Sequence, residues 1–129
     1  EHDTRRGWAI DGTPADCVKL GIAEFCPQRP ELVVSGINGG LNAGINVLYS
    51  GTVSAAIEGA FYGITSIAVS LEYDEHAEFD LAADIAMRVI RQILAQKPPA
   101  PLLYNINIPT SALRDYRGVR VVPMGVRRW

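Results

Sequence analysis

The chain has 129 residues, and its 12 lysines and arginines against 14 aspartates and glutamates give a formal net charge of −2. This charge excludes a basic arm for binding polymeric nucleic acid. Because 48% of the residues are hydrophobic and only 20% are charged, the composition excludes intrinsic disorder and predicts a single globular domain over residues 1–129.

Apolar runs rich in β-branched residues alternate with helical patterns along the chain, which predicts an α/β fold with a mostly parallel sheet. The first helix is expected over residues 14–25. Thr13 is suited to be its N-cap, Pro14 occupies the first turn, and Asp16 is placed to complete a capping box. Residues 32–37 then predict a buried strand, because their side chains suit a sheet that is covered on both faces.

Residues 38–49 hold three glycines and three asparagines, a density of turn formers that predicts a loop. After this loop, residues 53–62 form an alanine-rich stretch that predicts a helix ending at Gly63, with residues 50–52 just before its start. The next strand is expected over residues 64–70.

The clearest helical pattern covers residues 80–97. Apolar side chains recur there at every fourth position in two adjacent rows: Leu81, Ile85, Val89 and Ile93, and beside them Ala82, Ala86, Ile90 and Leu94. A proline-rich stretch at residues 97–101 is expected to end this helix. A further strand is expected over residues 102–108, before Pro109, and another over residues 119–122.

Cys17 and Cys26 are the two cysteines, too few for a disulfide framework, and we expect them to be reduced and buried. The longest apolar run, at residues 64–71, is interrupted by a threonine and two serines. It is well short of the roughly 20 residues that a membrane-spanning helix needs. We therefore expect no membrane partner and a cytoplasmic location.

Open α/β sheets bind ligands at the carboxyl ends of their strands, so the segment after residue 37 is the expected place for a site. Its glycines let the backbone approach a ligand, and its asparagine amides offer oxygen ligands and N–H donors. Ser50, Gly51 and Thr52 add two hydroxyls at a helix N-terminus, where unpaired N–H groups favour an anion. Together these groups suit a phosphate, although an ordinary loop followed by a capped helix would show the same pattern.

Other kinds of site fit the sequence less well. Gly39 and Gly44 have the spacing of a P-loop, but Ile45 and Asn46 stand where that loop requires Lys and Ser or Thr. The acidic run at residues 74–80 could ligate a divalent cation, yet acidic residues at the start of a helix are also the usual complement to its dipole. No combination of nucleophile, histidine and acid is discernible.

Four strings of the sequence occur together in one known family: GTPADCV at residues 12–18, VSGINGGLN at 34–42, YSGTV at 49–53 and NINIP at 105–109. From about residue 9 to 125, the chain closely resembles SurE, the survival-protein E family of metal-dependent 5′/3′-nucleotidases. The resemblance implies hydrolysis of nucleoside monophosphates, a three-layer Rossmann-like core, a Mn²⁺ or Mg²⁺ cofactor, and a homo-oligomer that is a dimer or a tetramer.

The resemblance also assigns residues. Asn38 matches the family's metal-ligating asparagine, and Asn42 with Ser50, Gly51 and Thr52 matches its phosphate-binding loop. Family members open with a strand ending in Asp-Asp-Gly, which gives the metal two carboxylates, and a serine loop adds a ligand; neither motif is in this sequence.

We therefore expect the chain to be the middle portion of a SurE-like nucleotidase. Its sheet would lack the first strand, and the catalytic acidic residues would lie outside it. Because hard divalent cations prefer carboxylates, we expect these residues alone to be weakly active or inactive. Two alternatives stay open: a non-catalytic module that binds phosphate or nucleotide, and a structural fragment.

Overall fold

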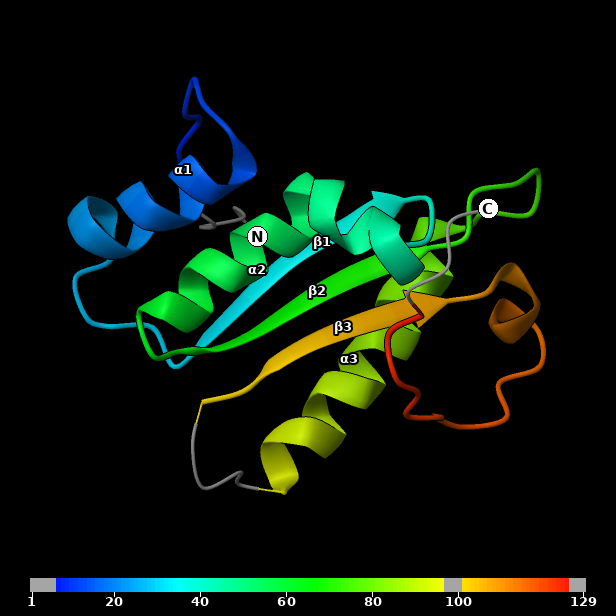
Figure 1. Ribbon diagram of the computed structural model, residues 1–129. Coiled ribbons are helices and arrows are strands. Elements are labelled where there is room, and N and C mark those ends of the chain that lie inside the picture. Colours follow the sequence, from blue (N-terminus) through cyan, green and yellow to red (C-terminus); the bar gives the residue numbers. More distant parts are fainter. Residues whose placement is uncertain (1–6, 97–100, 126–129) are drawn as a thin grey trace, which may run out of the picture.

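The computed structural model describes residues 7–96 and 101–125. Three parallel strands form one sheet in the order β1 (Leu32–Gly39), β2 (Thr65–Leu71) and β3 (Leu103–Ile108). Figure 1 shows α1 (Pro14–Leu20) and α2 (Gly51–Phe61) on one side of this sheet and α3 (Phe79–Ala95) on the other. The expected α/β fold with three layers and a parallel sheet is confirmed.

The central strand β2 is the only one of the three described strands that is buried along almost its whole length. Its side chains alternate between two cores, because successive residues of a strand point to opposite faces. Ile67, Val69 and Leu71 pack against the apolar face of α3, whereas Ala68 packs against Val53 and Ala56 of α2. The central strand therefore contributes side chains to both helical layers.

The helix α3 buries most of the two apolar rows that the sequence predicts: Ala82, Ile85, Ala86, Val89, Ile90 and Ile93. Leu94 is an exception and is 46% exposed. The predicted end of this helix at residue 97 lies outside the described residues.

The strand β1 is less covered than its sequence predicts. Val34 is 48% exposed, and within the described residues β1 pairs with β2 alone. The expectation that residues 32–37 are covered on both faces is therefore wrong, because β-branched residues also suit the half-covered strand at a sheet's edge.

A β-bulge in β1 decides which face its last residues occupy. Ser35 lies opposite Ala68, but the next aligned pair is Asn38 opposite Ser70, so three steps along β1 match two along β2. The extra residue moves Asn38 onto the face that carries Ser70 and α2, because side chains alternate along a strand. Without the bulge, Asn38 would face α3.

The segment between β1 and α2 is more regular than the predicted loop. β1 continues through Asn38 to Gly39, and residues Gly44–Tyr49 form the 3₁₀-helix η2. The loop prediction is therefore wrong for most of residues 38–49, because strand pairing and a short 3₁₀ turn both accommodate turn-forming residues. Only residues 40–43 lie outside an element.

The first helix is confirmed over residues 14–25, since α1 continues as the π-helix η1 (Gly21–Phe25) and the Thr13–Asp16 capping box is present. The prediction of a strand at residues 119–122 is wrong. Val121 is 94% exposed, and neither sheet edge in the described part of the chain pairs with that segment.

Both cysteines are free, as expected, but Cys17 is half-buried and Cys26 is exposed, so the prediction that they are buried is wrong. Both lie in or beside α1 and η1, which bury none of their side chains. Among the described helices, none is long and apolar enough to cross a membrane.

Candidate phosphate-binding site

Polar side chains meet on the α2 face of the sheet where the three strands end. The register places Asn38 of β1, Ser70 of β2 and Asn107 of β3 on this face, side by side across the sheet. Figure 1 shows the chain leaving the end of β1 and turning back over this edge into α2. The carboxyl edge of a parallel sheet is the usual ligand-binding edge, and here it is polar.

Asn38 and Thr52 are in contact across this edge. The hydroxyl of Thr52 donates to Oδ1 of Asn38 at 3.4 Å, and Nδ2 of Asn38 donates to the carbonyl of Gly40 at 2.7 Å. These two bonds orient the amide so that its oxygen faces the start of α2. We call Asn38 together with residues 50–52 the cradle.

The N-terminus of α2 supplies the donors of the cradle. Ser50 is the N-cap, and its Oγ accepts from the N–H of Val53 at 3.1 Å, so its hydroxyl proton stays available for a ligand. The first N–H groups of a helix have no partner within the helix. In α2 these belong to Gly51 and Thr52, and the helix dipole favours an anion beside them.

Gly51 has a packing role as well as its predicted role at the ligand. A Cβ on Gly51 would lie 3.1 Å from Cγ of Pro14, the first residue of α1. The glycine therefore lets the start of α1 lie against the start of α2, which brings residues 12–18 and 49–53 together in space. Because Asn38 belongs to the string at residues 34–42, three of the four motif strings meet at the cradle.

Asn42 is placed differently from the other predicted site residues. It is only 6% exposed, and its Nδ2 donates to Oγ of Ser70 at 2.7 Å. Its backbone N–H donates to Oδ1 of Asn107, and its carbonyl accepts from Nδ2 of both Asn105 and Asn107. The amide of Asn42 thus holds the loop to the sheet, and a contact with phosphate stays a prediction for it.

Sequence reasoning gave no role to Ser70, Asn105 and Asn107. A usable signal was present, because two asparagines separated by one residue in an apolar strand must lie on the same face. Asparagine is also depleted in strands, so a pair of them at the carboxyl end of a strand calls for a reason. The contacts with Asn42 supply that reason.

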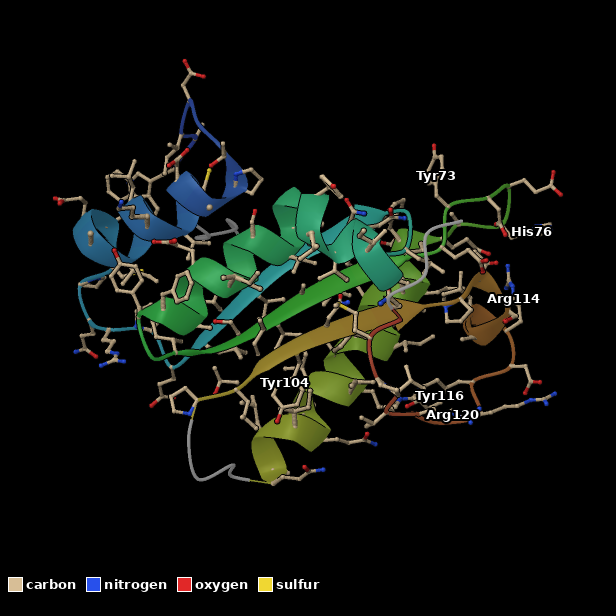
Figure 2. All side chains as sticks on the ribbon, viewed as in Figure 1. Tyr73, His76, Tyr104, Arg114, Tyr116 and Arg120 are labelled. Carbon is tan, nitrogen blue, oxygen red and sulfur yellow. The ribbon has the colours of Figure 1, made fainter. Side chains whose placement is uncertain are left out.

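Thr110 links two acidic side chains at the start of the loop after β2. Thr110 is buried, and its hydroxyl lies 2.8 Å from Oδ2 of Asp74 and 3.2 Å from Oε2 of Glu72. Figure 2 shows Tyr73 and His76 pointing outward from this loop, with Arg114 beside it. In the described part of the chain, no three His, Cys, Asp or Glu side chains gather closely enough to hold a metal ion.

We expect Thr110→Val to raise the pKa of Asp74. The hydroxyl of Thr110, followed by the N–H of His76, holds the pKa of this carboxyl below its usual value. A lowered folded-state pKa adds stability that is present above the unfolded pKa and is lost as the pH falls through the folded pKa. The stability deficit of Thr110→Val should therefore shrink on acidification below about pH 4.

The measurement is a carboxyl NMR titration of Asp74 combined with denaturation at several pH values. Thr110→Ser keeps the hydroxyl and is the control. An unchanged pKa of Asp74 in Thr110→Val would show that the hydroxyl contact does not control this group.

Comparisons with known proteins bear on the whole chain. The family model described as survival protein SurE matches residues 1–129. A protein named 5′-nucleotidase SurE from Rhodopirellula baltica is 57% identical over 123 residues, covering 95% of this chain and 49% of the relative. A protein of the same name from Gloeobacter violaceus is 49% identical, covering 95% of this chain and 46% of the relative.

The solved structures agree with the sequence comparisons. The crystal structure of the SurE protein from Aquifex aeolicus superposes with a TM-score of 0.84 at 41% identity, over 92% of this chain and 48% of that one. The chain thus spans about half the length of the relatives that it matches.

Proposed function

This chain belongs to the survival protein SurE family, and from that premise we propose that it is the phosphate-holding part of a 5′/3′-nucleotidase. The substrate would be a nucleoside monophosphate, and the reaction would release inorganic phosphate and a nucleoside. The relatives named 5′-nucleotidase support the reaction class.

The contact between Asn38 and Thr52 is the observation that carries this proposal. It brings a neutral amide oxygen to the N-terminus of α2. There the hydroxyl of Ser50 and the first helical N–H groups can donate to a ligand, while the hydroxyl of Thr52 donates to Asn38. A phosphate monoester offers several oxygens to such donors, and a developing charge on those oxygens would be stabilised without reorganisation of the protein. Ser50, Gly51 and Thr52 would bind the phosphate.

A divalent cation, Mn²⁺ or Mg²⁺, is part of the proposal, and Asn38 would be one of its oxygen ligands. The donor set in the described residues does not complete such a site, because it offers neutral oxygens and no carboxylate beside them in the cradle. Such cations are usually held through one or more carboxylates. We therefore propose that the remaining ligands and the general base come from other residues of the whole protein.

The test measures the binding of AMP, inorganic phosphate and adenosine to the 129-residue chain. Binding is detected by NMR as shifts of the backbone amide resonances. If the cradle holds the phosphate, AMP and inorganic phosphate shift the amides of Gly51 and Thr52, and adenosine does not. Shifts confined to another part of the chain, or equal responses to AMP and adenosine, would contradict the proposal. Binding by the chain together with inactivity of the whole protein would favour a non-catalytic nucleotide-binding module.

A further inference from the structure

We propose that Ser70, Asn105 and Asn107 are positioning residues for the cradle. They hold Asn42 in place, and through it they set the loop at residues 40–43 that orients the amide of Asn38. This inference rests on the proposed function for its consequence in binding, but not for its structural part.

The oxygen and the nitrogen of the Asn107 side-chain amide both form hydrogen bonds with the backbone of Asn42. Its Oδ1 accepts from the N–H of Asn42 at 2.8 Å, and its Nδ2 donates to the carbonyl of Asn42 at 3.0 Å. Asn105 donates to the same carbonyl at 2.7 Å. The peptide groups of Asn42 are therefore satisfied by side chains of a strand more than 60 residues away in sequence, rather than by a neighbouring backbone.

The other end of the loop is held at Gly40. Its N–H donates to the carbonyl of Leu71 in β2 at 2.8 Å, and its own carbonyl accepts from Nδ2 of Asn38. The direction of this carbonyl decides which way the amide of Asn38 turns. Because Gly40 is two residues from Asn42, releasing Asn42 would let that carbonyl move.

Strand formation alone does not favour asparagine at positions 105 and 107. Asparagine is unfavourable in strands compared with valine or isoleucine, and β3 is otherwise largely apolar over residues 103–108. The side-chain amides of Asn105 and Asn107 form hydrogen bonds with the backbone of Asn42, which lies in the loop that leads into the cradle. A role in holding that loop explains both their type and their place at the carboxyl end.

The experiment compares Ser70→Ala and Asn107→Leu with the matched control Ser66→Ala. Ser66 and Ser70 are both fully buried on the same face of β2, but the hydroxyl of Ser66 donates to the carbonyl of Ile64, far from the loop. We expect Ser66→Ala and Ser70→Ala to lower the thermal midpoint comparably. Only Ser70→Ala and Asn107→Leu should shift the side-chain amide resonances of Asn38 and speed hydrogen exchange at Asn42.

The affinity for AMP is the second measurement. If wild type binds AMP, Asn107→Leu and Ser70→Ala should weaken binding at least five-fold, and Ser66→Ala should weaken it less than two-fold. If the ligand-free resonances of Asn38 and Thr52 are the same in Asn107→Leu as in wild type, the positioning role is overturned. Failure of the wild type to bind AMP would instead count against the proposed function, and the ligand-free resonances would still decide the positioning role.

Discussion

Replacing Gly36 with alanine is expected to lower the free energy of unfolding by about 3 kcal/mol or more. Gly36 lies in the bulge of β1 with a φ of 124°, which L side chains rarely adopt. A Cβ there would overlap the backbone carbonyl oxygen of Val69 in β2. The overlapping atom belongs to the buried central strand, so it cannot move aside as the end of a flexible side chain would.

Two other glycines separate the causes of this loss. Gly118 has a φ of 109° but open space around its Cβ position, so Gly118→Ala should cost only the backbone strain. Gly21 is helical with a φ of −55° and also has open space, so Gly21→Ala should be neutral or stabilising by up to about 1 kcal/mol. Urea denaturation checks all three, and a cost for Gly36→Ala no larger than that for Gly118→Ala would refute the clash.

The second large effect is expected at Asn38. In an active protein that contains this chain, Asn38→Ala should reduce phosphate release from AMP by about 100-fold or more, the scale of losing a key stabilising group in an active site. The substitution removes both the oxygen beside Thr52 and the donor to Gly40. It would therefore weaken the proposed cation site and loosen the loop.

Asn46 offers a matched control for that change. It is an exposed asparagine in η2, within the same segment, so Asn46→Ala should keep activity within about two-fold of wild type. Activity is measured as inorganic phosphate released with and without Mn²⁺. Equal rates for Asn38→Ala and wild type would remove Asn38 from the site.

Much of the fold follows from local patterns in the sequence. The helix at residues 79–95 has a regular apolar stripe, and the capping box at Thr13 and Asp16 was readable from residue types alone. The bulge in β1 was not readable, because it depends on the alignment of β1 with β2 across some 30 residues. The prediction of a strand at residues 119–122 was wrong for a similar reason. A strand forms only when it pairs with another strand, and local composition does not show whether such a partner is in reach.

The cradle itself was predicted from glycines, hydroxyls and amides at one sheet edge. Residue types alone did not show which contacts each asparagine makes. Asn38 lies beside Thr52, whereas Asn42 is tied to β2 and β3. Three asparagines spaced four residues apart look alike by residue type, and the bulge and the register of the three strands decide which contacts Asn38 and Asn42 make.

The most direct test of the nucleotidase account is phosphate release by a chimera. In it, this chain replaces the matched region of the Rhodopirellula baltica relative, which is 57% identical. The account predicts Mn²⁺-dependent release of phosphate from AMP by the chimera. A folded chimera that leaves AMP intact, while the intact relative hydrolyses it under the same conditions, would contradict the account.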